Sequence, residues 1–497
     1  MLEKMDLTKK MDKETYKERL EELQAQLGEL QRECKTLEIP VMIAFEGFDA
    51  AGKGSQIAEL IQALDPRGFE VHAVKQETEN ERMYPFLWRF WTKTPENGRI
   101  AIYDSSWYRR VLIERFEKLI TNEQLGDAYD SICAFERQLS DGGMAIIKIF
   151  LCVDQKEQRK RFDKLLESKD TAWRVTKGDL ERNEKFAKYL AINEEMLQKT
   201  DTDYAPWTLV EATDRRFATI KIYTTVIQIL RAKVEAAKRP KPEVPQSTVK
   251  QEYDKELQSS ILSKADLSKS LTEEEYKKNL KVLQKKIKKL HGEMYLKRIP
   301  LVLGFEGWDA GGKGGAIKRL TQKMDPRGYV VHPTASPNDI ERKHHYLWRF
   351  WEAMPKNGHA TIFDRTWYGR VMVERIEGFC TKEEWQRAYK EINDMENDLV
   401  NAGAVVIKFW LQIDKDEQER RFEERKMNPE KQWKITDEDW RNREKWDQYE
   451  EAVDEMLIRT STPKSPWVVV EGNDKYYARI KVLQTVVDAL EAKLKES

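Results

Sequence analysis

Residues 301–320 read LVLGFEGWDAGGKGGAIKRL, and residues 41–60 read VMIAFEGFDAAGKGSQIAEL. Each stretch runs from a short apolar segment through a glycine-rich turn into a segment with helical spacing. Glycines in such a turn let backbone N–H groups surround phosphate oxygens, and the start of the helix adds partial positive charge. The pattern G-x-x-x-x-G-K therefore predicts two phosphate-binding loops, with Gly47, Gly52, Lys53, Gly307, Gly312 and Lys313 as their glycines and lysines.

The two loops belong to a tandem repeat. An offset of 260 residues maps FEGFDAAGKG onto FEGWDAGGKG and continues to the final helical segments. Residues 238–250 contain three prolines, which break helical patterning and indicate a semi-rigid linker. We therefore expect an N-terminal domain over 1–237 and a C-terminal domain over 251–497.

Both copies show the same order of expected elements. A charged amphipathic helix (16–36 and 273–297) comes first, and five apolar runs then alternate with helical segments. The second run leads into a helix rich in Trp and Arg, and the fourth leads into strongly charged helices. Nearly apolar strands separated by helices predict an α/β fold with a parallel sheet covered on both faces. The expected strands are 40–45, 70–75, 99–104, 144–153 and 207–211, and then 300–305, 330–335, 359–364, 404–413 and 467–471.

Two carboxylates accompany the second loop. The Ser or Thr that usually follows the loop lysine and holds Mg²⁺ is replaced by Gly314, while Asp309 lies inside the loop and Asp364 ends the third strand. Mg²⁺ prefers hard oxygen ligands, so we expect Asp309 and Asp364 to bind it. The alternative is that each Asp only caps a loop or helix. The first copy has Gly54, Asp49 and Asp104 at the same positions.

Cationic side chains cluster in two places in the second copy. One group follows the second and third strands, and the other follows the fourth strand, where P-loop kinases insert a lid. Such cations would clamp phosphates during transfer. The alternative is a solvated helix face, since glutamates are interleaved. We expect the nearby Trp residues to be core. The first group is Arg349, Arg365, Arg370 and Arg375, and the second is Arg420, Arg421, Arg425, Lys426, Lys431 and Lys434.

Composition excludes several other classes of protein. Of the 497 residues, 40% are hydrophobic, which excludes a disordered chain. Lys+Arg and Asp+Glu are both 87, so global charge favours neither nucleic acid nor membrane. The four cysteines form no CxxC pair, and no apolar run is long enough to span a membrane. We expect no signal peptide, because the charged N-terminus has no apolar h-region. We expect a cytoplasmic protein, and the six histidines show no zinc-binding pattern.

Several longer motifs point to a known family. FEGWDAGGKGGAIKRL, HHYLWRFW, IFDRTWYGRVMVERIEGF and PWVVVEGNDKYYARIKVL together resemble the polyphosphate kinase 2 family. The resemblance covers nearly all of 273–494, and the repeat extends it to 16–234. It implies tandem P-loop kinase domains, each a thymidylate-kinase-like parallel sheet flanked by helices with a helical lid. It also implies Mg²⁺-dependent phosphoryl transfer between inorganic polyphosphate and a nucleotide.

The fused arrangement is similar to family members that phosphorylate AMP to ADP with polyphosphate, and the reverse or ADP-directed reaction is possible for such enzymes. The resemblance also makes a homo-oligomer the expected assembly. It implies an active site of Asp309, Lys313, Asp364, Arg365 and Arg421. Around it we expect phosphate-binding positions at Gly307, Gly312, Lys313, Gly314, Arg349, Arg370 and Arg420, with Lys53 and Gly52 in the first copy.

The two copies are not equivalent. The N-terminal copy keeps Asp49, Lys53 and Asp104, but Ser105 stands in place of Arg365 and Arg109 in place of Gly369. It therefore lacks a cation expected beside the transferring group. We expect the C-terminal copy to perform most or all of the catalysis, while the N-terminal copy binds polyphosphate or stabilises the assembly. Two alternatives stay open: an ATP-dependent kinase of the nucleoside-monophosphate type, and a non-catalytic polyphosphate-binding protein.

Overall fold

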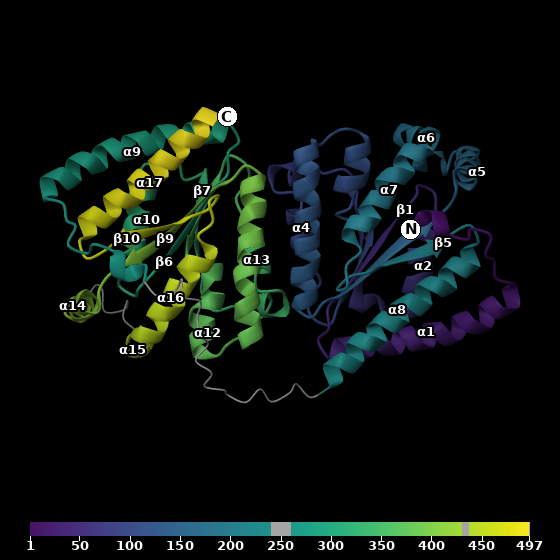
Figure 1. Cartoon of the computed structure of the whole chain (residues 1–497), viewed down its shortest axis with the longest axis horizontal. Helices are drawn as coiled ribbons and strands as arrows, with labels where there is room; N and C mark the ends of the chain where they lie inside the picture. Colours follow the sequence, from purple (N-terminus) through teal and green to yellow (C-terminus); the bar gives the residue numbers. More distant parts are fainter. Residues whose placement is uncertain (240–259, 430–436, 497) are drawn as a thin grey trace. The chain divides into compact units, whose positions relative to one another are not determined.

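The computed structural model describes residues 1–239, 260–429 and 437–496. Each half of the repeat contains one five-stranded sheet (Figure 1). The predicted linker at 238–250 lies outside the described residues beyond Arg239. The chain divides into two compact units, the first of Met1–Thr78, Phe86–Gln246 and Asn338–His345, and the second of Glu79–Pro85, Ser247–Pro337 and Tyr346–Ser497.

The sheet of the N-terminal unit is parallel, with the strand order β2-β3-β1-β4-β5. Val41 of the central strand pairs with Ile100 on one side and with Ala145 on the other. Strands β1 and β4 are buried throughout, because helices cover both faces, whereas the edge strand β2 is partly exposed. The strands are β1 (Val41–Gly47), β2 (Phe69–Ala73), β3 (Ile100–Asp104), β4 (Ala145–Cys152) and β5 (Trp207–Glu211).

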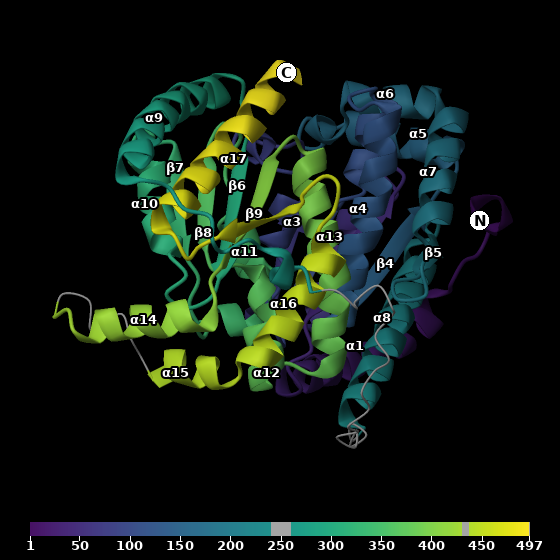
Figure 2. The ribbon, with the colours of Figure 1, turned by 60° about the vertical axis from the view of Figure 1, so that its left-hand side comes forward.

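The C-terminal unit repeats this topology, with the order β7-β8-β6-β9-β10 (Figure 2). All its strand pairs are parallel, and Phe305 at the end of β6 pairs with Asp364 at the end of β8. The predicted α/β fold with parallel sheets is confirmed in both units. The strands are β6 (Leu301–Gly307), β7 (Tyr329–Pro333), β8 (Ala360–Asp364), β9 (Val405–Gln412) and β10 (Trp467–Glu471).

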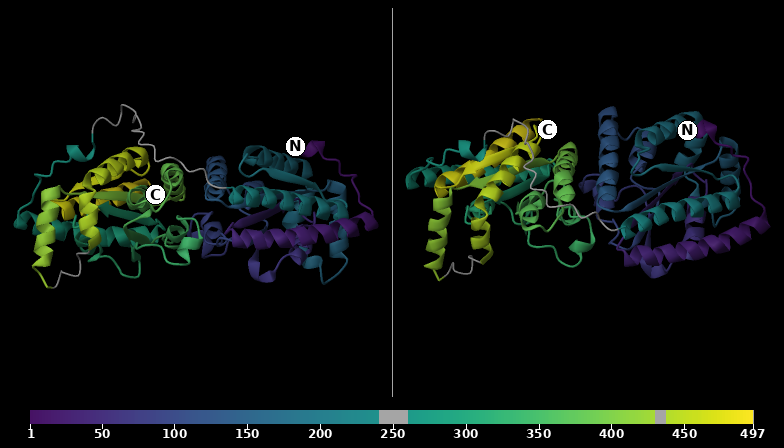
Figure 3. Two further views of the ribbon diagram at one scale, coloured as in Figure 1. Left: turned by 90° about the horizontal axis from the view of Figure 1, so that it is seen from below. Right: turned by 60° about the horizontal axis from the view of Figure 1, so that its bottom comes forward.

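Helices cover both faces of each sheet (Figure 3). In the C-terminal unit α9, α10 and α17 pack on one face, and α13 with α16 packs on the other. The N-terminal unit places α1, α2 and α8 on one face and α4 with α7 on the other. The helices of the first unit are α1 (Lys13–Thr36), α2 (Lys53–Leu60), α3 (Trp88–Trp91), α4 (Asn122–Asp141), α5 (Gln155–Leu166), α6 (Lys177–Glu184), α7 (Phe186–Thr200) and α8 (Arg215–Lys238). Those of the second are α9 (Glu273–Leu296), α10 (Lys313–Thr321), α11 (Trp348–Glu352), α12 (Val373–Glu377), α13 (Lys382–Asn401), α14 (Lys415–Lys426), α15 (Asp437–Glu444), α16 (Trp446–Thr460) and α17 (Lys475–Glu496).

Local sequence explains where α9 begins and which face it buries. Thr272 and Glu275 form a capping box, in which each side chain accepts the other residue's backbone N–H. Leu283, Ile287 and Leu290 then recur at helical spacing and enter the core between the sheet and α17. The helix therefore starts at a polar cap and is held by one apolar stripe.

The segment rich in Trp and Arg is shorter than the sequence suggests. Instead of a full helix, α11 is a single turn, because Pro355 follows Met354 and disfavours helical backbone there. Trp351 and Trp367 are fully buried, which confirms them as core residues, whereas Trp348 is half-buried. The turn after β8 is also irregular, with a 3-10 turn at Trp367–Val371 before the short helix α12.

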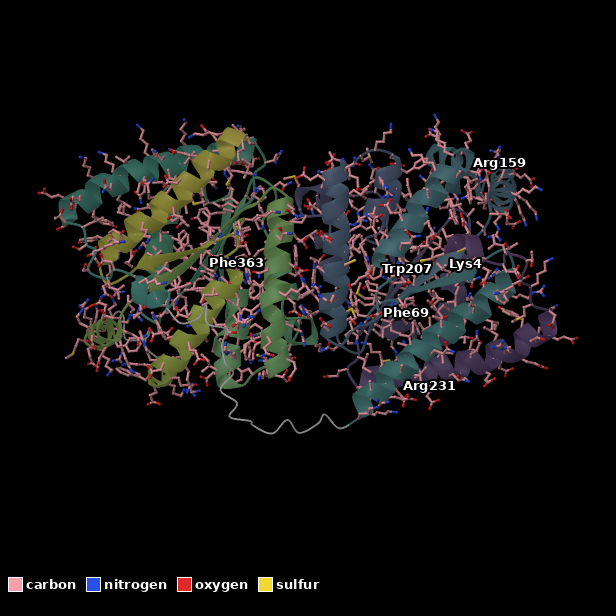
Figure 4. The ribbon with its side chains drawn as sticks, viewed as in Figure 1. Lys4, Phe69, Arg159, Trp207, Arg231 and Phe363 are labelled. Atoms are coloured by element: carbon pink, nitrogen blue, oxygen red, sulfur yellow. The ribbon has the colours of Figure 1, made fainter. Side chains whose placement is uncertain are left out.

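A buried ion pair lies in the middle of each unit. Lys408 of β9 donates to Glu396 of α13 at 2.7 Å and to the carbonyl of Thr460 at 2.6 Å, and both charged side chains are about 1% exposed. Glu396 also accepts hydrogen bonds from Trp367 and Tyr368. The same network recurs around Lys148 in the first unit, where the ring of Trp207 (Figure 4) covers the ammonium group. The lysine that interrupts each apolar run is therefore a fully paired core residue.

No helix in the described part of the chain combines the length and apolar character needed to cross a bilayer. The four cysteines, Cys34, Cys133, Cys152 and Cys380, are free thiols and are buried or half-buried.

Replacing Lys408 should destabilise the C-terminal unit strongly. The substitution Lys408→Met leaves the buried Glu396 carboxylate without its cation, which costs about 3–5 kcal/mol. Urea denaturation followed by Trp fluorescence measures the loss. The matched control is Lys390→Met on α13, the helix that carries Glu396, because Lys390 is exposed and loss of its pair with Asp394 should cost no more than about 0.5 kcal/mol. Equal effects of the two substitutions would contradict this assignment.

Candidate active site

The C-terminal phosphate-binding loop joins β6 to α10 at the carboxyl edge of the sheet. Gly307 has φ +148°, and a Cβ there would lie 2.6 Å from the carbonyl oxygen of Leu411 on β9. Gly312 has φ +107° and directly precedes the first turn of α10, which begins with Lys313 and Gly314. Both glycines are therefore required by the backbone, and the loop lies where the strand order reverses, the usual ligand position in such sheets. Gly47 and Gly52 repeat this geometry in the first unit.

The loop lysines lie folded over their own loops. Lys313 Nζ donates to the carbonyl of Gly307 at 2.7 Å, and Lys53 Nζ makes the matching bond to Gly47 at 3.3 Å. Both ammonium groups thus remain at the loop, next to the backbone N–H groups at the start of the helix. This arrangement can hold phosphate oxygens from two sides.

Asp309 of the C-terminal loop contacts residues from three separate elements. Its carboxylate accepts a hydrogen bond from Asn442 Nδ2 at 3.0 Å and lies 3.4 Å from Arg365 Nη2. The Gln418 side chain donates to its backbone carbonyl at 3.1 Å. Asp309 is therefore fixed between the end of β8 and the two lid helices α14 and α15.

Asp364 and Arg365 occupy the end of β8, beside the loop. Arg365 has φ +66°, a left-handed conformation that is unusual for Arg. The next residue holds it there, because the backbone N–H and the hydroxyl of Thr366 both donate to Glu306 at 2.7 Å. Burial raises the pKa of Glu306, although the bonds from Thr366 oppose that shift. A buried carboxyl thus sets the backbone that presents Arg365 to the loop.

Trp308 and Trp410 line a pocket beside Asp309, and Trp446 packs on Trp308. The rings of Trp308 and Trp446 stack with centroids 3.6 Å apart and an angle of 6° between their planes. Trp308 and Trp410 both donate to the side-chain oxygen of Gln412, which fixes their orientation. We call this cavity the tryptophan pocket; its lining includes Trp308, Asp309, Lys313, Arg365, Gly369, Met372, Asn442 and Tyr449.

Arg421 fastens the loop from the lid helix α14. Its side chain is 3% exposed, and its guanidinium donates to the carbonyls of Ala310 at 2.9 Å and Gly472 at 2.6 Å. It also contacts Glu417. Arg421 therefore holds the loop against the end of β10. It also lines a second cavity, which we call the arginine cleft and which includes Gly312, Gly315, Arg421, Arg425, Lys475 and Arg479.

The other predicted cations lie away from this cluster. Arg349 donates to the carbonyl of Ala335, and Arg370 pairs with Glu374 at 3.1 Å. Arg420 bonds to two glutamates of its own helix, as expected for the solvated helix face. None of the three lines the tryptophan pocket or the arginine cleft, so their phosphate-binding role stays a prediction. Lys431 and Lys434 lie outside the described residues.

The sequence analysis missed three residues of this site, namely Asn442, Trp308 and Trp446. Trp308 directly precedes the loop aspartate, whereas Asn442 and Trp446 reach this region only through tertiary packing of α15 and α16. A position-by-position comparison of the two copies could have marked these residues as ones that differ. Asn442 matches Arg182, and Trp308 and Trp446 match Phe48 and Phe186. Phe48 and Phe186 also stack, with centroids 5.0 Å apart.

Comparisons with known proteins agree with this geometry. The sequence profile of polyphosphate kinase 2 (PPK2) matches residues 10–239 and 270–497. Over its full length the chain is 40% identical to the whole of a polyphosphate:AMP phosphotransferase from Pseudomonas aeruginosa, and it is 36% identical to one from Acinetobacter johnsonii, with 91% of each chain covered. A crystal structure of a polyphosphate kinase 2 from Pseudomonas aeruginosa matches all of both chains with a TM-score of 0.88 and 39% identity. Two matched domains and full-length relatives lead to one conclusion: the chain belongs to the polyphosphate kinase 2 family.

Proposed function

We propose that this chain transfers the terminal phosphoryl group of inorganic polyphosphate to AMP, forming ADP, in its C-terminal unit. The full-length relatives carry the name of this activity. The observation that carries the proposal is the cluster of Lys313, Asp309 and Arg365 in the tryptophan pocket, on a loop whose Gly312 also lines the arginine cleft. A transfer between two phosphate-bearing substrates needs such a meeting point.

The reaction joins the acceptor to the end of the chain. A non-bridging oxygen of the AMP phosphate attacks the terminal phosphorus of polyphosphate in line with the bridging oxygen. The new P–O bond forms as the bridging P–O bond breaks, and the shortened chain leaves with the electron pair. The AMP oxygen is already ionised, so no general base is required. The protein contributes orientation and positive charge.

Each residue of the cluster has a distinct role in this proposal. Lys313 and the loop N–H groups hold the transferring phosphoryl group, and Arg365 neutralises charge that develops on it. The aromatic wall and Tyr449 offer a surface for the nucleoside of AMP in the tryptophan pocket. Arg421 acts as a positioning residue, because its guanidinium is occupied by loop carbonyls. The polyphosphate chain lies along the arginine cleft.

Magnesium fits the C-terminal residues. Mg²⁺ is usually held by one or two carboxylates together with substrate phosphates, and Asp309 and Asp364 supply two carboxylates at adjacent strand ends. Among the described residues, no group of three His, Cys, Asp or Glu side chains gathers as a metal site, so the phosphates would complete the coordination. When bound, the ion would neutralise phosphate charge. Asp309 and Asp364 would hold it.

The C-terminal unit performs the catalysis in this proposal. Arg365 lies 3.4 Å from Asp309, whereas the N-terminal unit has Ser105 at the matching position. The N-terminal loop therefore lacks the cation that neutralises the transferring group. A cytoplasmic location and a homo-oligomeric assembly stay predictions.

Nucleotide products distinguish this function from its alternatives. The full-length protein is mixed with polyphosphate, Mg²⁺ and AMP without ATP, and products are separated by chromatography. We expect ADP from AMP, with much less ATP when ADP is the acceptor. Turnover with ATP but not with polyphosphate would replace the proposal by an ATP-dependent kinase.

The two loop lysines should differ in their effect on catalysis. Lys313→Ala removes a charge from the transferring phosphoryl group and should lower kcat by about 10²–10³-fold, as for other charge-stabilising donors. Lys53→Ala is the matched comparison and should leave kcat at saturating polyphosphate within about twofold, because the N-terminal loop does not contact the transferring phosphoryl group in this proposal. Initial rates of ADP formation measure both. The reverse pattern would assign catalysis to the N-terminal unit.

Removal of the divalent cation should stop the reaction. Excess EDTA should abolish ADP formation, and added Mg²⁺ should restore it, because two carboxylates and the phosphates otherwise repel one another. Asp309→Asn should raise the Mg²⁺ concentration needed for half-maximal rate by about tenfold, since a hard anionic ligand is lost. Asp49→Asn should leave that concentration unchanged. Activity that persists in EDTA would rule out the metal role of Asp309.

A further inference from the structure

The two units neutralise their loop aspartates in different ways. In the C-terminal unit, Asp309 accepts a hydrogen bond from the neutral amide of Asn442 at 3.0 Å, and the Arg365 guanidinium beside it, at 3.4 Å, is exposed. In the N-terminal unit the matching residue is Arg182, whose Nε donates to Asp49 Oδ2 at 2.7 Å. The Arg182 side chain is only 5% exposed. A fixed guanidinium therefore occupies the loop carboxylate of the N-terminal unit.

The surroundings of Arg182 make this charge permanent. Its guanidinium also pairs with Asp179 and lies 3.5 Å from Glu117, and it packs over the ring of Tyr189. Burial by itself would lower the pKa of Arg182, but the carboxylates of Asp49 and Asp179 raise that pKa above its ordinary value. Arg182 thus stays charged and held from several sides.

A divalent cation does not fit this loop. To reach Asp49, the ion would have to displace a buried guanidinium and leave it next to a second positive charge, which is strongly unfavourable. The position that lines the tryptophan pocket as Gly369 in the C-terminal unit is also a cation here, Arg109. Arg182 and Arg109 therefore occupy the positions that are Asn442 and Gly369 in the lining of the tryptophan pocket.

The other side of the N-terminal loop is open. A cavity of about 1140 Å³ runs from the loop to α5 and the segment after it. Three carboxylates line it, and two of them, Asp49 and Asp179, are already paired with Arg182. Lys164 stands where the C-terminal unit has Glu424. The five cations that line the cavity are Lys53, Arg161, Lys164, Arg174 and Arg215.

We propose that the N-terminal cavity binds a phosphate chain without a divalent cation and without a nucleotide, and that Arg182 takes the place of the metal at Asp49. Arg161 and Arg215 are themselves paired with Glu157 and Glu59. Lys53, Lys164 and Arg174 then face Asp104, the third lining carboxylate, and this excess of positive charge suits an extended polyanion. The choice of a phosphate chain as ligand rests on the proposed function. The N-terminal unit would then hold the donor while the C-terminal unit transfers its end.

The test measures chain binding directly, on the full-length protein. Fluorescently end-labelled polyphosphate is titrated with Lys313→Ala protein, whose C-terminal loop is weakened, in Mg²⁺ or in EDTA at equal ionic strength. Anisotropy should give dissociation constants within about twofold of each other under the two conditions. Loss of binding in EDTA would overturn the proposal.

Two substitutions in the Lys313→Ala protein locate the binding. Lys164→Glu installs the C-terminal residue on an exposed helix position and should weaken chain binding about tenfold. Arg182→Asn installs the amide of Asn442 and should make binding depend on Mg²⁺. Unchanged binding in Lys164→Glu would overturn the site, and binding by Arg182→Asn that still ignores Mg²⁺ would overturn the role of Arg182.

Circular dichroism checks that each variant is folded, and the exposed Lys164 keeps the test valid if Arg182→Asn does not fold. AMP phosphorylation by the unmodified protein is measured separately. Metal-free chain binding without any ADP formation would refute the proposed function and support the N-terminal site. ADP formation without metal-free chain binding would support the proposed function and refute the N-terminal site.

Discussion

The close approach of a loop glycine to the neighbouring strand is the constraint on which both phosphate-binding loops depend. At Gly307 a side chain would collide with the backbone of Leu411, so the loop can lie this near β9 only with glycine. That approach sets where α10 begins and where its N–H groups point. Asp309, Lys313 and the end of β8 then meet at one edge of the sheet, where an anion gains most from the helix start.

The two copies share this backbone arrangement but differ in the charged groups around the loop aspartate. The buried network of Lys408, Glu396 and Tyr368 recurs in the first unit as Lys148, Glu136 and Tyr108. The backbone scaffold is thus equally well anchored in both units. What differs are the partners of the loop aspartate: the amide of Asn442 and the exposed Arg365 in one unit, and the buried guanidinium of Arg182 in the other. We infer that three changes around the loop, at Ser105, Arg109 and Arg182, separate retention of the chain from transfer of the phosphoryl group.

Much of the fold could be predicted from the sequence, because its signals are local. Apolar runs between helices indicated all ten strands, and the glycine pattern placed both loops. The third-strand aspartate was predictable for the same reason, since parallel strands end at one edge. The helix rich in Trp and Arg was also predicted, and the structure shows that it is short, because Pro355 disfavours helical backbone just after it.

The site was less predictable, because its decisive contacts come from distant segments. The sequence predicted that Arg421 binds substrate phosphates, but in the structure its guanidinium donates to the carbonyls of Ala310 and Gly472. Asn442 and Trp446 carry no local pattern that marks them as neighbours of Asp309. Only the packing of α15 and α16 brings them there, and only the second copy, with Arg182 in place of Asn442, shows that the position matters.

The central claim is that the C-terminal unit alone takes the nucleotide. Equilibrium dialysis of radiolabelled AMP against the full-length protein, with Mg²⁺ and without polyphosphate, tests it most directly. The account predicts that binding saturates at one AMP per chain. Saturation at two AMP per chain would show that the N-terminal unit also binds the nucleotide despite Arg182, which would contradict this claim.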